Sequence, residues 1–128
     1  MEQTKLLEAQ MQARRIYNAL GEVADLSKQI AEALDRNDPM AVKVLLAMRE
    51  EPIMTAQLAR EALQQMIGET ENNQRLRELL NGAEAKTSEE TGLAGQVAMN
   101  TRLLAQVQEM DRAVSKKITR DKSVYEIE

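Results

Sequence analysis

The first 36 residues carry the pattern that most constrains the fold. Small and aliphatic side chains recur there at alternating intervals of three and four residues, with one polar interruption at Ser27. The positions are Leu6, Ala9, Ala13, Ile16, Leu20, Val23, Ser27, Ile30 and Leu34. This spacing places them along one side of an α-helix, where they can face a partner helix. The sequence therefore predicts a long helix over residues 2–36.

A second helix is predicted over residues 39–81. Asp38 can cap it through its carboxylate, and Pro39 suits the first helical position because its missing N–H costs nothing there. Pro52 falls inside the helix, where a proline removes a backbone hydrogen bond and crowds the preceding turn. We therefore expect a kink near Pro52. Residues 69–74 are polar all round, which predicts that the helix frays there or projects beyond its packing partners.

A third helix is predicted over residues 88–122. Asn81-Gly82 indicates a turn before it. Thr87-Ser88-Glu89-Glu90 matches the capping-box pattern, in which the Thr87 hydroxyl and the Glu90 carboxylate each reach an unpaired backbone N–H. Its apolar positions again follow three-four spacing, as Leu93, Val97, Leu104, Val107, Val114 and Ile118. Residues 123–128 have neither a cap nor a periodic pattern, and we expect a mobile tail.

Three long helices with short connections predict an all-α fold, an elongated antiparallel bundle or coiled coil that forms one domain over residues 1–122. The composition agrees with this interpretation. The chain has no Phe or Trp, two Tyr, five Gly and two Pro. A β-sandwich or β-barrel needs many more turn residues and more aromatic or β-branched strands.

The residue types available argue against catalysis. The chain has no Cys and no His, so it lacks a thiol nucleophile, the commonest general base and the commonest metal ligands. Close carboxylate pairs such as Glu50-Glu51 are adjacent in sequence and diverge on a helix. We expect no metal site, no cofactor and no enzymatic activity. The expected partners are other proteins.

Charge and hydropathy narrow the partners further. The net charge of −4 disfavours nucleic acid, whose phosphates need a basic face. A basic cluster near the end of the third helix (Arg112, Lys116, Lys117, Arg120 and Lys122) is interpreted as the solvated end of that helix. No apolar stretch approaches the ~20 residues that span a bilayer, so no membrane insertion is expected. The first residues do not match a secretory signal, and a cytoplasmic location is expected.

Two polar residues, Asn100 and Asp111, interrupt the apolar positions of the third helix. They either fix the register of helix pairing, as a buried Asn does in coiled coils, or face solvent, or contact a ligand. A second apolar stripe lies beside these positions, at Met99, Leu103, Met110 and Val114. It indicates either a wider core or dimer contact, or a groove for a foreign amphipathic helix. Flexible methionine side chains suit such a groove.

Three stretches of the chain resemble the FlgN-type flagellar export chaperones. Residues 34–49 resemble their passage of a short acidic turn, a leucine pair and an arginine, here Asp35 to Asp38, Leu45-Leu46 and Arg49. Residues 100–104, Asn-Thr-Arg-Leu-Leu, resemble the passage that opens their client-binding C-terminal helix. Tyr125 lies where these chaperones carry a tyrosine that docks on the export gate. The tail after Tyr125 is short, and Pro52 has no place in the family pattern.

The resemblance implies a cytoplasmic chaperone. It would bind the amphipathic C-terminal helices of the hook–filament junction proteins and deliver them to the flagellar type III export gate. Carried over by position, the client-binding residues would be Asn100, Leu103, Leu104, Val107 and Met110, and Tyr125 would dock on the gate. The alternative from the residues alone is a structural coiled coil or adaptor that self-associates, with a homodimer as its simplest form.

Overall fold

A computed structural model describes residues 3–68 and 73–120 of the chain. Within these residues the elements are the helices α1 (Gln3–Asp35), α2 (Pro39–Gly68), α3 (Gln74–Leu80) and α4 (Thr91–Arg120), with a short 3₁₀ turn (Ser88–Glu90) before α4. No strand occurs in the described part. The predicted all-α fold is therefore confirmed.

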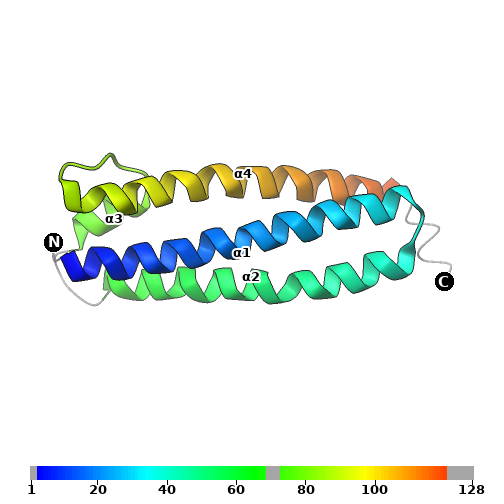
Figure 1. The fold of residues 1–128 in the computed structure, drawn as a ribbon, viewed down its shortest axis with the longest axis horizontal. Helices are drawn as coiled ribbons and strands as arrows, with labels where there is room; N and C mark the ends of the chain where they lie inside the picture. Colours follow the sequence, from blue (N-terminus) through cyan, green and yellow to red (C-terminus); the bar gives the residue numbers. More distant parts are fainter. Residues whose placement is uncertain (1–2, 69–72, 121–128) are drawn as a thin grey trace.

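The three long helices lie side by side in an elongated bundle (Figure 1). Helix α1 is the central element, because it packs along its length against both α2 and α4. Consecutive long helices run in opposite directions, as the short connections predict, so α4 runs parallel to α1. The short helix α3 lies at the end of the bundle that holds the start of α1.

The α1–α2 connection is built as the sequence predicts. Asn37 has a left-handed φ of 56°, and its N–H donates to the carbonyl of Leu34 at 3.1 Å. The N–H of Asp38 donates to the carbonyl of Ala33 at 3.0 Å, which completes the hydrogen-bond pattern that commonly ends a helix. The Asp38 carboxylate then accepts the N–H of Ala41 at 3.1 Å. The predicted cap on the second helix is present.

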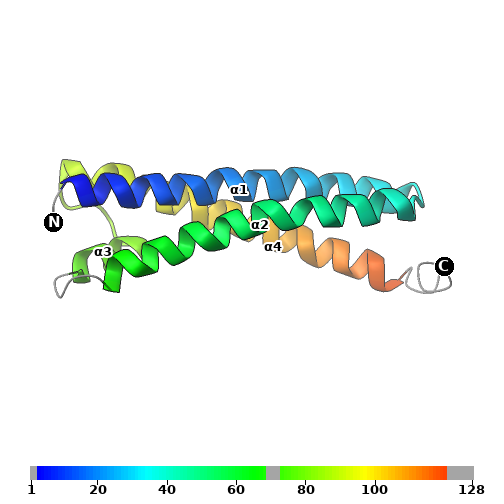
Figure 2. The same ribbon diagram turned by 90° about the horizontal axis from the view of Figure 1, so that it is seen from below.

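Helix α2 continues through Pro52, which lies inside it and is buried. Figure 2 shows α2 changing direction about halfway along its length, the region that holds Pro52. This agrees with the expected kink, because a proline leaves one carbonyl of the preceding turn unpaired and pushes it aside.

The prediction of one helix over residues 39–81 is wrong. Helix α2 ends at Gly68 and a separate helix, α3, begins at Gln74. Asn73 accounts for part of the separation, because its backbone is not helical (φ −101°, ψ 18°). Its side-chain amide donates to the carbonyls of Met66 and Ile67 at 2.7 and 2.8 Å. Those carbonyls belong to the last turn of α2, so Asn73 caps that helix from outside.

The predicted start of the third helix is partly wrong. Residues 88–90 form a 3₁₀ turn and α4 begins at Thr91. Thr87 makes no side-chain cap hydrogen bond, so its half of the capping box is missing. The Glu90 carboxylate does accept a backbone N–H, that of Lys86, one residue before the expected cap, at 2.9 Å. The predicted helix end at 122 and the predicted mobile tail 123–128 fall outside the described residues.

Aliphatic side chains form three buried clusters along the bundle. The cluster nearest α3 contains Leu6, Ala9, Ala13, Leu63, Leu76, Leu79, Leu93 and Val97. The middle cluster contains Leu20, Val23 and Val107. The cluster at the α1–α2 turn contains Ile30, Ala33, Leu34, Val42 and Val114. All but one of the predicted core positions of α1 (Ile16 is half-buried) are therefore buried, as is Ser27, the polar member of that set.

Candidate functional site

Ser27 and Asp111, two polar interruptions of the apolar spacing, meet at one arginine. Arg49 of α2 donates to the Ser27 hydroxyl at 3.0 Å and to the Asp111 carboxylate at 2.5 Å. Ser27 is 1% exposed and the Asp111 side chain is 45% exposed, so this polar layer joins all three helices and extends from the core to the surface. Sliding any one helix would leave the arginine without these partners. The geometry therefore favours the register-fixing interpretation of Asp111.

The Asn100 side chain is also hydrogen-bonded to a neighbouring helix. Its side-chain amide donates to the carbonyl of Ala13 in α1 at 2.8 Å. Its carbonyl oxygen accepts from the Gln96 amide at 3.1 Å. Both ends of the Asn100 side chain are therefore engaged inside the bundle. These bonds connect α4 to α1.

The five expected client-binding residues do not share one open groove. Val107 is 5% exposed and lies in the middle buried cluster, and Leu103 packs against the same cluster. Asn100 and Met110 are half-buried. Leu104 is the exposed member of the set. Asn100, Leu103 and Val107 thus come together on the side of α4 that faces α1, while Tyr125, the expected gate contact, lies outside the described residues.

The second apolar stripe of α4 is largely used within the bundle. Val114 packs with the cluster at the α1–α2 turn, and Leu103 packs with the middle cluster. Met99 is exposed at the edge. Of the two interpretations of this stripe, the geometry favours a wider core.

A larger exposed apolar surface lies on α2. Five of its side chains are more than half exposed, with exposed fractions from 52% to 70%. They are Met40, Val44, Met48, Met54 and Leu58, and we call them the outward stripe. Their spacing of four, four, six and four residues keeps them on one side of the helix, turned away from α1.

The sequence carries a signal for this surface, although the exposed residues lie outside the apolar positions that face α1. In residues 40–48 every position except Lys43 is apolar. Val42 of this run is buried, whereas Met40, Val44 and Met48 are exposed. A helix that is apolar all round needs partners on more than one side. Since α1 covers only one side of α2, the other side remains open.

One charged residue, Glu51, lies within the outward stripe between Met48 and Met54. It is exposed, and among the described residues its side chain has no hydrogen-bond or ion-pair partner. Glu50 and Glu61 are exposed beside the stripe. The surroundings of the stripe are therefore acidic over its middle and its C-terminal end.

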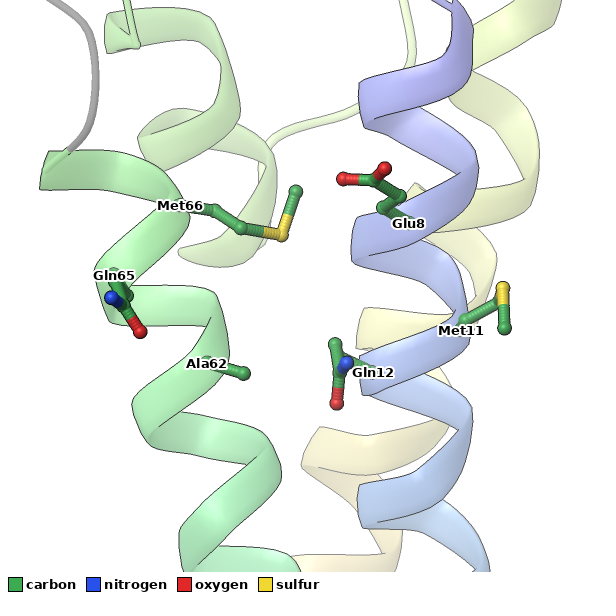
Figure 3. A pocket seen from close by; sticks show the side chains of 6 residues that line it. All are labelled: Glu8, Met11, Gln12, Ala62, Gln65 and Met66. Carbon is green, nitrogen blue, oxygen red and sulfur yellow. The ribbon is translucent and has the colours of Figure 1, made fainter.

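An open hollow continues the stripe beyond Leu58. It lies between α1 and α2, has a volume of about 280 Å³ and is lined by Glu8, Met11, Gln12, Ala62, Gln65 and Met66. Figure 3 shows Met66 and Glu8 pointing toward one another across it. Sites for small-molecule ligands are larger and enclose most of the ligand. The size and openness of this hollow suit a single side chain of a larger partner.

The most perturbed carboxyl in the described chain, Glu90, belongs to a structural cluster. Its oxygens accept from Arg75 at 2.6 and 2.9 Å, and Arg75 also donates to the Glu84 carbonyl at 2.7 Å. The hydrogen bonds from Arg75 and from the Lys86 N–H lower the pKa of Glu90 from 4.5 to about 2. The pair ties α3 to the start of α4. A hollow of about 220 Å³ adjoins Glu90 and is also lined by Gln3, Leu6, Thr87 and Glu89, and it is smaller than the usual site for a small-molecule ligand.

The described ranges 3–68 and 73–120 contain no group of three acidic side chains placed to hold a metal ion. In the same ranges, every helix is too short or too polar to cross a membrane.

Known proteins provide no guide to the site. Comparison of the chain with models of protein families, with curated proteins and with solved structures finds no match. The likeness to FlgN-type chaperones therefore rests on residues 34–49, residues 100–104 and Tyr125 alone.

Proposed function

We propose that this chain is a non-catalytic protein-binding module that captures an amphipathic helix of another protein on the outward stripe of α2. The observation that carries the proposal is the exposure of five aliphatic and thioether side chains on one side of a single helix. Amphipathic helices bind such surfaces through apolar residues spaced three and four apart. Three of the five side chains are methionines, whose flexible thioethers adapt to partners of different shape.

The energetics suit reversible capture. Burying the exposed parts of these five side chains would contribute roughly 4–8 kcal/mol, since full burial of one such side chain contributes about 1.5–3 kcal/mol. Association itself costs about 4–15 kcal/mol in lost freedom. The stripe alone therefore supports weak binding, which a carrier that later releases its client requires.

The specific role that we propose is that of a cytoplasmic export chaperone for the hook–filament junction proteins. The three stretches that resemble the FlgN-type chaperones support it. The surface on α2 differs from the one implied by that resemblance, which lies on α4. Leu104 is the residue that can test the α4 surface cleanly, because it is exposed, whereas a charge at the half-buried Leu103 would disturb the core.

A co-purification experiment tests the proposal. The bait is the full chain, and the candidate clients are C-terminal segments of hook–filament junction proteins from the same genome. Leu58→Lys should abolish capture and Leu104→Glu should leave it intact, with circular dichroism showing that both variants remain helical. Loss of capture with Leu104→Glu alone would move the client site to α4. No capture by the unaltered chain would refute the chaperone role.

Self-association is the second candidate function, because a second copy would also cover the outward stripe. Sedimentation at micromolar concentration separates the two. A monomer agrees with a chaperone whose outward stripe is unoccupied before the client binds. A tight dimer that Leu58→Lys dissociates would favour a structural coiled coil.

A further inference from the structure

We infer that the helix bound by the outward stripe is basic, with a lysine or arginine that meets Glu51 and an apolar side chain that enters the hollow between α1 and α2. This inference rests on the proposed function and adds the chemistry of the partner. It follows from the position of Glu51 and from the shape of the surface next to Leu58.

Glu51 sets the charge of the partner. It lies between Met48 and Met54, on the exposed side of α2 that the bound helix would cover. A helix that buries the stripe therefore also removes the Glu51 carboxylate from water. A buried carboxylate without a partner is strongly unfavourable. The described part of this chain offers Glu51 no cation. The cation therefore has to come from the bound helix.

The flanks of the stripe favour the same sign of charge. Glu50 and Glu61 are exposed on α2 beside the stripe, and Glu8 of α1 lines the hollow at its end. Lys43 is the exposed cation near the beginning of the stripe. Cationic residues along the edge of a bound helix would find carboxylates over the central and C-terminal parts of the surface, which gives electrostatic complementarity.

A second copy of this chain fits the same surface less well. Residue 49 is the midpoint between Met40 and Leu58, so a two-fold antiparallel pairing of the stripes would be centred there. Glu50 and Glu51 of both copies would then lie within about one helical turn of each other. Four carboxylates in so small an interface repel one another. The charge pattern therefore favours a foreign helix.

The hollow provides an anchor site at one end of the stripe. Ala62 lies one turn beyond Leu58, and its small side chain leaves space between Met66 of α2 and Gln12 of α1. Well-packed apolar anchors contribute most of the affinity at protein interfaces. A leucine or methionine at the end of the bound helix would fill this space while its cation reaches Glu51.

Two synthetic peptides test the inference. Both are amphipathic helices of about 18 residues, the length of the stripe at 1.5 Å per residue. They share a leucine and alanine face and differ only in carrying lysine or glutamate elsewhere. Fluorescence anisotropy with the full chain should show at least about tenfold tighter binding of the lysine peptide, equivalent to about 1.4 kcal/mol. The difference should shrink as salt is added.

Matched variants test whether Glu51 is the source of the preference for the lysine peptide. Glu51→Lys should remove most of the preference, whereas Glu32→Lys, at an exposed position on the outer side of α1, changes the net charge equally and should leave most of it. Ala62→Leu should weaken both peptides by filling the hollow. An unchanged affinity in the Ala62→Leu variant would overturn the anchor.

The remaining outcomes separate the inference from the function on which it rests. Equal binding of the two peptides, lost with Leu58→Lys, would overturn the basic partner and leave helix capture standing. Equal effects of Glu51→Lys and Glu32→Lys would show that only net charge matters, which also overturns the contact at Glu51. Binding of neither peptide, together with self-association through α2, would overturn both proposals.

Discussion

Two leucines on α2 allow a direct test of which side of this helix supports the fold. Leu63 is 7% exposed and packs in the cluster nearest α3, whereas Leu58, five residues earlier, is 58% exposed on the outward stripe. Replacing either by alanine changes the helix propensity by the same small amount. Any difference between the two variants therefore reports on tertiary packing.

The expected magnitudes follow from burial. Leu63→Ala removes three buried carbons, which lowers the free energy of unfolding by about 2.4 kcal/mol through transfer alone, at 0.8 kcal/mol per methylene. The cavity left behind adds to this, for a total of about 3 kcal/mol. Leu58→Ala should cost less than about 1 kcal/mol, because most of that side chain is already in water. A domain with a stability of about 5–15 kcal/mol remains folded in either case.

Urea unfolding followed by far-ultraviolet circular dichroism is the appropriate assay, since the chain has no Trp. The urea midpoint should fall by about 1–2 M in Leu63→Ala, with an unchanged slope, and should barely move in Leu58→Ala. Equal losses in the two variants would refute the reasoning. They would mean that the outward stripe is covered in the unliganded protein, and a midpoint that depended on protein concentration would identify another copy as the cover.

Other regions of the bundle give further expectations. The pKa of Glu90 is lowered to about 2 by the hydrogen bonds from Arg75 and from backbone N–H groups, so its stabilising effect is complete above about pH 4.5 and is lost as the pH falls toward 2. Urea midpoints of the wild type and Glu90→Gln should therefore differ at neutral pH and converge in acid; parallel pH profiles would contradict this. Gly95→Ala should raise the free energy of unfolding by about 0.5–1 kcal/mol, because a methyl group there meets open space inside a helix. Gly82→Ala should lower it, since φ is +100°, and a gain in its melting temperature would count against that backbone argument. Asn100→Ala should cost about 1 kcal/mol through the lost hydrogen bond to α1; unchanged stability combined with loss of client capture would support Asn100 as a binding residue.

Much of the fold could be predicted because it depends on spacing along single helices. The three-four pattern of α1, the cap at Asp38 and the stop at Gly82 are local signals, and the structure contains each of them. The separation of α2 from α3 could not be predicted in this way. It depends on Asn73 reaching back to the carbonyls of Met66 and Ile67, a contact that only the folded chain reveals.

The candidate surface was harder to predict, because spacing shows that a residue is on an apolar side but not which helix covers that side. Leu103 and Val107 on α4 and Met40 and Val44 on α2 are equally apolar in sequence. The first two face α1 and the last two face water. The polar residues Ser27 and Asp111, which interrupt the apolar spacing in the sequence, prove to share Arg49.

The central position of α1 has a consequence for the order in which the bundle assembles. Its contacts with α2 close across a turn of three residues, and even the Ser27–Arg49 bond spans only 22 residues. The bond from Asn100 to Ala13 spans 87, and each doubling of such a loop adds about 0.6 kcal/mol of closure entropy. A chain leaving the ribosome would therefore pair its first two helices before α4 exists. For that interval, the side of α1 destined for α4 is itself an unprotected apolar surface on a nascent hairpin.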